Sequence, residues 1–176
     1  TISNSVKAYS DYGNFIRNKF GERVQKISIN VGFTCPNRDG SKGRGGCTYC
    51  NNQSFKPDYC EPQNDIGEQL KKGIDFFSQK RNINKFLAYF QSYTNTYAEL
   101  DLIKDLYLKA LSYPGVVGLV IGTRPDCISE ELIEFLSELS KKYFICLELG
   151  VESTLDRSLE AVNRCHTFAE TQEAYK

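Results

Sequence analysis

The stretch KISINVGFTCPNRDGSKGRGGCTYC, residues 26–50, determines how the rest of the chain is interpreted. Its first part places apolar side chains at Ile27, Ile29 and Val31, which is the alternation of a β-strand. That strand runs toward Cys35, where a loop rich in glycine and cysteine begins. Because glycine allows positive φ and close backbone approach, such a loop can wrap a compact inorganic core. The stretch therefore predicts a strand that leads into a metal-binding loop.

The loop carries three cysteines, at Cys35, Cys47 and Cys50, and eleven residues separate the first two. Three thiolates can hold three irons of a [4Fe–4S] cluster and leave the fourth iron open to a ligand, whereas a cluster that only carries electrons normally has four cysteines. Tyr49 lies between the last two cysteines and can shield the cluster or stack on a planar ligand. We therefore expect a cluster with an open iron.

Composition is that of a cytoplasmic protein with one substantial core. The 176 residues carry 22 basic and 22 acidic side chains. No apolar run reaches the roughly 18 residues that span a bilayer, so we expect no membrane partner. Seven cysteines, an odd number with three of them bunched among glycines, indicate metal binding more than disulfides.

Strands and helices alternate along the sequence. We expect a helix at 10–20, with Ser10 as N-cap and Gly21 as its end, before the first strand. The later elements are a helix at 65–81, a strand at 86–91, a helix at 99–112, a strand at 116–121, a helix capped by Ser129, a strand at 143–151, a short helix with Leu155, Leu159 and Val162, and a last helix opened by Thr167 and Glu170 at capping-box spacing.

This order predicts an α/β fold in which a parallel sheet is covered by helices and curls toward a barrel. In such barrels the chemistry gathers at the carboxyl ends of the strands. Four segments fall there: the cysteine loop from Cys35, SYTN at 92–95, GTRPD at 122–126 and GVES at 150–153.

At these residues the sequence resembles the radical S-adenosylmethionine (radical SAM) superfamily, whose signature is a three-cysteine loop with an aromatic residue just before the last cysteine. The long spacing is similar to that of a bacterial subgroup, the YhcC-like proteins, which are related to the Elp3 radical SAM domain. Further matching stretches are VGFTCPNRDG at 31–40, YFQSYTNTYA at 89–98, GTRPDC at 122–127, LELGVES at 147–153 and NRCH at 163–166.

The resemblance implies a partial (β/α) barrel of radical SAM type, with about four βα units of an expected six present. We accordingly expect a helical lead-in at 1–25 and a radical SAM core at 26–176, with the barrel continuing beyond Lys176.

The implied function is that of an enzyme of oxidoreductase type. A [4Fe–4S] cluster held by Cys35, Cys47 and Cys50 would cleave S-adenosylmethionine reductively to methionine and a 5′-deoxyadenosyl radical, which abstracts hydrogen from an unknown substrate. An external one-electron donor such as flavodoxin or ferredoxin would reduce the cluster. The substrate can be a small molecule, a protein or RNA, and an Elp3-like role in tRNA modification is an alternative within this interpretation.

The resemblance also assigns residues to S-adenosylmethionine. Glu152 would bind the ribose, and Arg164, twelve residues later, would lie near the methionyl carboxylate. The remaining candidates are Tyr49, Ser92, Thr94, Asn95 and Thr123, with Arg124 and Asp126 either joining them or only pairing with each other.

Three polar or reactive residues outside the signature have simpler interpretations. Glu148 lies inside an apolar strand, where a carboxylate is costly unless paired, so we expect an ion pair across the sheet. His166, the single histidine, is more often a structural hydrogen bonder than a catalyst. Cys146 lies in an apolar strand, where it most often packs as a small hydrophobe.

Two alternatives come from other classes of protein. In the first, Cys60 joins Cys35, Cys47 and Cys50 in a four-cysteine structural zinc site. In the second, Cys47 and Cys50 form a thioredoxin-type dithiol. That motif normally opens a helix, whereas here turn-like sequence follows.

Overall fold

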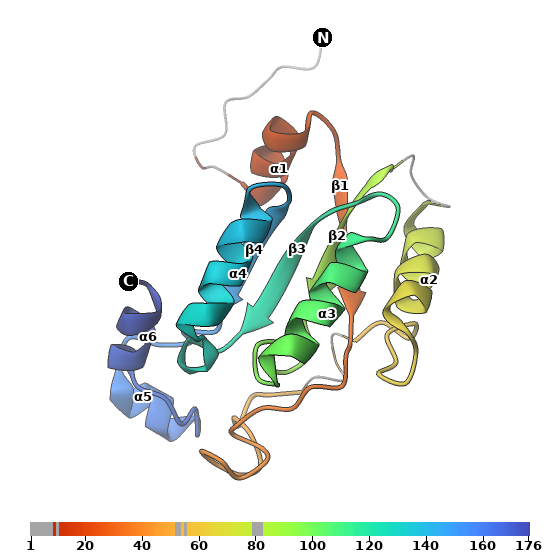
Figure 1. Ribbon diagram of the computed structural model, residues 1–176. Coiled ribbons are helices and arrows are strands. Elements are labelled where there is room, and N and C mark those ends of the chain that lie inside the picture. The colour runs from red at the N-terminus through yellow and green to blue at the C-terminus, as the bar shows by residue number, and fades with distance from the viewer. Residues whose placement is uncertain (1–8, 10, 52–53, 55, 79–82) are drawn as a thin grey trace.

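A parallel sheet of four strands forms the centre of the computed structural model, which describes residues 9, 11–51, 54, 56–78 and 83–176 (Figure 1). The strands are β1 (Val24–Ile29), β2 (Lys85–Phe90), β3 (Val116–Thr123) and β4 (Phe144–Leu149), and they lie in the sheet in chain order. Every neighbouring pair is parallel. The predicted α/β fold is confirmed, since helices connect the strands as in a partial β/α barrel.

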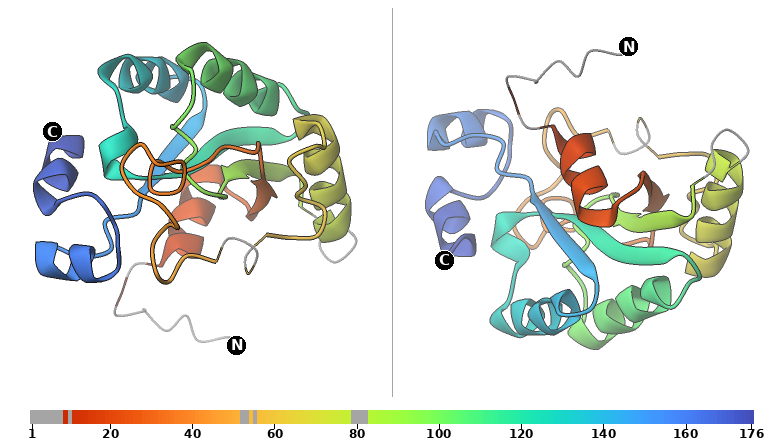
Figure 2. Two further views of the ribbon diagram at one scale, coloured as in Figure 1. Left: turned by 90° about the horizontal axis from the view of Figure 1, so that it is seen from below. Right: turned by 90° about the horizontal axis from the view of Figure 1, so that it is seen from above.

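Helices cover the two faces of the sheet unequally. The connecting helices α2 (Ile66–Ser78), α3 (Leu100–Leu111) and α4 (Glu130–Ser140) pack on one face, and α1 (Tyr12–Phe20) packs on the other (Figure 2). After β3 comes a short 3₁₀ turn, η1 (Pro125–Cys127), and after β4 come α5 (Asp156–Ala161) and α6 (Phe168–Ala174). The inner face, on the side of α1, is thus left partly open.

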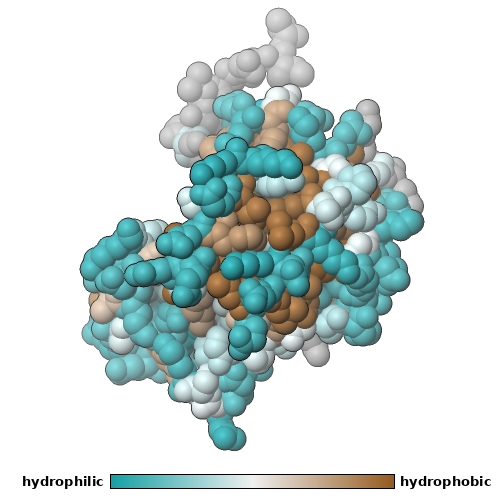
Figure 3. All heavy atoms as spheres, viewed as in Figure 1, coloured by the Kyte–Doolittle hydropathy of each residue, from teal (hydrophilic) through white to brown (hydrophobic). Residues whose placement is uncertain are grey.

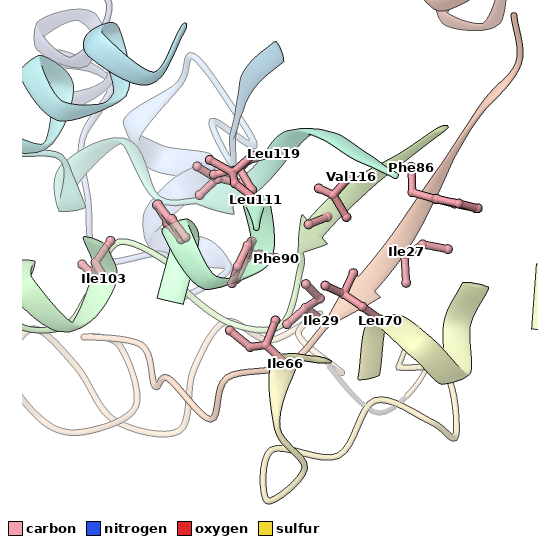
Figure 4. Packing of buried hydrophobic residues seen from close by; sticks show 14 of the residues in the cluster. Ile27, Ile29, Ile66, Leu70, Phe86, Phe90, Ile103, Leu111, Val116 and Leu119 are labelled. Carbon is pink, nitrogen blue, oxygen red and sulfur yellow. The ribbon is translucent and has the colours of Figure 1, made fainter. Parts of the chain in front are cut away.

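The main core lies between the sheet and its three connecting helices. Ile27 and Ile29 of β1 meet Leu70 of α2, and Phe90 of β2 packs at 4.8 Å between ring centroids on Tyr107 of α3 (Figure 4). All five side chains are fully buried. On the outer side of these helices, apolar residues gather at the surface over α3 and α4 (Figure 3). A smaller cluster, Ile16 with Leu87 and Val120, joins α1 to the inner face.

Element ends agree with the predictions to within a few residues, with physical reasons for the differences. Helix α1 begins at Tyr12 because the Asp11 side chain accepts from the Asn14 N–H (2.8 Å); the predicted cap, Ser10, lies outside the described residues. Gly21 ends α1 at φ 73°, as predicted. Strand β3 extends two residues past the predicted end, because it continues to pair with β4 as far as Thr123.

Other predicted boundaries fall close to those observed. Helix α2 is described as far as Ser78, and the predicted last turn at 79–81 lies outside the described residues. Ser129 caps α4, and Thr167 and Glu170 form the predicted capping box of α6. Strand β1 begins at Val24, inside the segment predicted as a helical lead-in.

The long connection between β1 and α2 crosses the carboxyl ends of the strands, where it lies beside α5 and α6 (Figures 1 and 2). This connection contains the cysteine loop. The topology therefore brings the loop and the segments after β2, β3 and β4 to one edge of the sheet.

Within the described part of the chain, no helix is both long and apolar enough to cross a membrane.

Candidate functional site

A cavity of about 410 Å³ lies at the carboxyl ends of the strands. Cys35, Cys47 and Cys50 all line it, together with residues that follow β2, β3 and β4. Five of the residues predicted to contact the cofactor also line it: Tyr49, Thr94, Thr123, Glu152 and Arg164. The structure thus gathers residues from distant parts of the sequence around one space.

Backbone hydrogen bonds fix the cysteine loop. The N–H of Gly46 donates to the carbonyl of Asn37 (2.9 Å), and the N–H of Cys50 donates to the carbonyl of Cys47 (3.0 Å). Gly46 has φ 82°, and a Cβ on it would lie 2.8 Å from Nε of Arg38. The left-handed backbone favours glycine there, and the guanidinium end of Arg38 lies close to it.

The thiol of Cys47 is surrounded by donors. Nη1 of Arg164 lies 3.6 Å from its sulfur, and Nδ2 of Asn37 lies 3.5 Å from it. Burial raises the pKa of the Cys47 thiol, but the hydrogen bond and charge of Arg164 outweigh burial, so the pKa is lower than usual. A lowered pKa favours the thiolate, which is the form that ligates metals.

Arg124 lies beside Cys35 in a buried charge network. Its Nη1 is 4.0 Å from the sulfur of Cys35, while Nε and Nη2 each donate to Asp126 at 2.8 Å. Lys42, in the cysteine loop, donates to the same carboxylate (2.7 Å) and to Glu170 of α6 (2.9 Å). Burial would raise the pKa of Asp126, but the two cations lower it to about 2. The expected pairing of Arg124 with Asp126 is confirmed.

Besides its contact with Cys47, Arg164 is held by two further groups. Its Nη2 donates to the carbonyl of Gly150 (2.7 Å), and its Nε donates to Nε2 of His166 (3.0 Å). An acceptor at Nε2 requires a neutral ring, so Nδ1 carries the proton and donates to the Thr167 carbonyl (3.2 Å). Burial and then the charge of Arg164 lower the pKa of His166, which favours the same neutral form. His166 makes hydrogen bonds within the structure, as a structural histidine would.

Glu152 lies beside Arg164 at the cavity wall, with its Oε1 4.0 Å from Nη2 of the arginine. Its backbone has φ 64°, so the strand alternation has ended before it. A Cβ on Gly150 would lie 2.7 Å from Nη2 of Arg164, so glycine at that position leaves room for the guanidinium beside the backbone. The side chain of Glu152 remains 38% exposed and is available to a ligand.

The inner face of the sheet contributes a polar group to the same cavity. Lys26 of β1 donates to Oε1 of Glu148 on β4 (2.6 Å), and the hydroxyl of Tyr89 on β2 donates to Oε2 (2.7 Å). The ammonium of Lys26 also lies 4.6 Å from the centre of the Tyr89 ring. The ion pair expected for Glu148 is confirmed, and it positions a carboxylate that lines the cavity.

Four polar or aromatic lining residues were not named as site candidates from the sequence: Arg38, Tyr89, Gln91 and Tyr93. For Tyr89 and Gln91 a signal was present, since they occupy alternate positions of the strand predicted at 86–91 and so share one face.

Two predicted residues lie away from the cavity. Asn95 is fully buried, and its Nδ2 donates to the carbonyls of Phe90 (3.0 Å) and Gly122 (2.9 Å). Ser92 is buried and is not part of the cavity lining. Asn95 therefore ties the ends of β2 and β3 together.

Cys60 also lies away from the cavity. Its side chain is 1% exposed, its sulfur lies 2.9 Å from the carbonyl of Ser28, and burial raises its pKa to about 12. A thiol with that pKa is a poor metal ligand at neutral pH.

The donor set fits an iron–sulfur cluster. In a cluster each thiolate binds a different iron, so the ligands stand further apart than around a single ion. Among the described residues, no three histidine, cysteine or acidic side chains are placed to hold one metal ion. Three cysteines around one cavity, with glycines in the loop between them, match the requirement of a cluster.

Comparison with known proteins gives the class. The sequence model of the Radical SAM superfamily matches residues 29–176, so the chain belongs to this superfamily. Members use a [4Fe–4S] cluster together with S-adenosylmethionine, and these are the cofactors of this chain. Enzymes of the superfamily generally need a reductant.

Individual relatives are also similar over nearly the whole chain. Protein YhcC of Escherichia coli (strain K12) is 39% identical over 93% of this chain and 52% of its own length. The uncharacterized protein YtqA of Bacillus subtilis (strain 168) is 33% identical over 94% of this chain and 52% of its own. The uncharacterized protein MJ0486 of Methanocaldococcus jannaschii is 36% identical over 96% of this chain and 52% of its own length. The chain spans about half the length of these relatives.

Proposed function

We propose that Cys35, Cys47 and Cys50 ligate the cluster and that S-adenosylmethionine binds beside it in the same cavity. One observation carries this proposal: the three cysteines and five of the predicted cofactor residues line a single cavity at the carboxyl ends of the strands. When bound, the cofactors supply a 5′-deoxyadenosyl radical that abstracts a hydrogen atom, a one-electron reaction of oxidoreductase type.

Different residues of the cavity bind different parts of S-adenosylmethionine. The exposed carboxylate of Glu152 accepts from ribose hydroxyls, and the guanidinium of Arg164 faces the methionyl carboxylate. Tyr49, half exposed beside Cys47, covers the cofactor on the open side. Thr94 and Thr123 support it from the ends of β2 and β3.

The substrate occupies the part of the cavity next to the inner face of the sheet. Glu148, held by Lys26 and Tyr89, offers it a carboxylate with a fixed orientation, and Gln91 offers an amide. A flavodoxin- or ferredoxin-type protein delivers the electron.

The test is anaerobic reconstitution with iron and sulfide, followed by reduction in the presence of S-adenosylmethionine. We expect about four irons per chain and formation of 5′-deoxyadenosine. Cys35→Ala, Cys47→Ala and Cys50→Ala should each abolish this product. Cys60→Ala is the matched control and should keep the iron content of the unmodified protein, because its thiol lies outside the cavity. Equal loss with Cys60→Ala would mean a four-cysteine site and would refute the proposal.

A further inference from the structure

Each of the three cysteines in the cavity has an arginine beside it. Nη1 of Arg164 lies 3.6 Å from the sulfur of Cys47, and Nη1 of Arg124 lies 4.0 Å from the sulfur of Cys35. Arg38 lies beside Cys50, to whose carbonyl its Nη2 donates at 3.2 Å.

Two of the guanidinium groups, those of Arg124 and Arg164, are buried and fixed by several contacts. Arg124, 2% exposed, is clamped by Asp126 and donates from Nη1 to the carbonyl of Arg164 (3.0 Å). Arg164, 8% exposed, is fixed by Gly150 and by the neutral ring of His166. Such clamping keeps each positive charge at a set distance from its thiol.

Carboxylates in the described part of the chain do not fully account for these charges. Asp126 neutralises Arg124 directly. Glu152 stands 4.0 Å from Arg164, at the limit of an ion pair, and no acidic residue that the structure describes pairs with Arg38, which instead lies 5.7 Å from the ring centre of Tyr93. A buried cation such as Arg164 is costly unless a negative group compensates it. The negative groups at hand are the thiolates and the cluster that they hold.

We propose that Arg38, Arg124 and Arg164, one beside each cysteine ligand, set the reduction potential of the cluster. The proposal rests on the cluster of the proposed function and adds a role to residues that do not ligate iron. Reduction adds one negative charge to the cluster, and a fixed cation nearby stabilises the reduced form. Net charge and hydrogen bonds to the sulfurs are known determinants of cluster potential. The three arginines therefore make the cluster easier to reduce.

The test is a redox titration of the reconstituted protein without S-adenosylmethionine, followed by absorbance and electron paramagnetic resonance. Arg38→Gln and Arg164→Gln should each raise the ratio of oxidised to reduced cluster about tenfold at a given potential. This corresponds to a midpoint potential that is about 59 mV lower. Arg38→Lys and Arg164→Lys, which keep the charge, should stay close to the unmodified protein. Arg17→Gln, an exposed arginine of α1, is the control and should leave the midpoint unchanged.

Arg124 allows an internal comparison. Arg124→Gln removes one positive charge, whereas the double variant Arg124→Gln with Asp126→Asn removes a pair and leaves net charge unchanged. The double variant should lower the midpoint less than the single one. Equal shifts in the two would contradict a charge effect.

Iron content, measured on every variant, separates the proposed cluster binding from the proposed role of the arginines. If the unmodified protein takes up no cluster, the proposed function fails and this inference fails with it. If Arg38→Gln, whose side chain is only partly buried, keeps full iron content and an unchanged midpoint, the inference is wrong and the proposed function stands.

Discussion

Acidification should weaken the fold through Asp126, whose carboxylate is 1% exposed and bonded to Arg124 and Lys42. Its pKa is about 2, against an ordinary value of 3.8. Between these values the native state binds fewer protons than the unfolded state, so stability rises with pH there. The contribution is complete above about pH 4 and disappears as the pH falls through about 2. The difference between these two pKa values corresponds to a contribution of roughly 2 kcal/mol to the free energy of unfolding.

The substitution Asp126→Asn tests the same contribution at constant pH. It leaves the buried guanidinium of Arg124 without its carboxylate, so the free energy of unfolding at pH 6 should fall by about 3 kcal/mol. The asparagine variant should also lose part of the decline between pH 4 and pH 2. Asp75→Asn is the control: Asp75 forms an exposed pair with Lys71 on α2, and its loss should cost under about 0.5 kcal/mol.

The assay is urea unfolding followed by circular dichroism at a series of pH values. If Asp126→Asn unfolds at the urea concentration of the unmodified protein at pH 6 and shows the same dependence on acid, the buried network does not stabilise the fold and this reasoning is wrong.

Three further predictions concern the cavity. His166 is the single histidine, so its titration can be followed by nuclear magnetic resonance without ambiguity. Its pKa should lie below 6.5, and the stability of the fold should fall as the pH drops below that value. A pKa above 6.5 would contradict the hydrogen bond from Arg164. Gly46→Ala should destabilise the cysteine loop by about 1–2 kcal/mol and reduce cluster uptake, because a φ of 82° is strained for a residue with a Cβ. Full iron content in this variant would argue against a role of the loop conformation in cluster binding. Glu152→Ala should keep its iron yet bind S-adenosylmethionine about ten- to a hundredfold more weakly in calorimetry, and unchanged affinity would remove Glu152 from the site.

The fold could be predicted because its signals are local. The strands are short segments with apolar runs or apolar alternation, and several helices are bounded by caps such as Ser129 or Gly21. Such patterns depend on neighbours in the sequence. The extension of β3 to Thr123 was missed because pairing with β4 decides it.

The site was predictable only where a motif specified it. Within SYTN the sequence gives no direction for each side chain, and Tyr93 at φ 62° changes the direction of the chain. As a result Tyr93 and Thr94 line the cavity, while Ser92 and Asn95 do not. The position of a single left-handed residue depends on contacts that the sequence alone does not show.

The arginines beside the cysteines illustrate a second limit. Arg124 and Cys35 are 89 residues apart, and their contact exists because β1 and β3 end at the same edge of the sheet. The sequence predicted a pair between Arg124 and Asp126, two residues apart, and that pair is present. The added contact with the thiol required the three-dimensional structure.

The most direct test of the central claim, a three-cysteine cluster with one iron open to S-adenosylmethionine, is Mössbauer spectroscopy of protein reconstituted with iron-57. We expect about four irons in one cluster, with about one quarter of the signal changing when S-adenosylmethionine is added. A spectrum that stays the same after the addition, or a protein that binds zinc and no iron–sulfur cluster, would contradict the account.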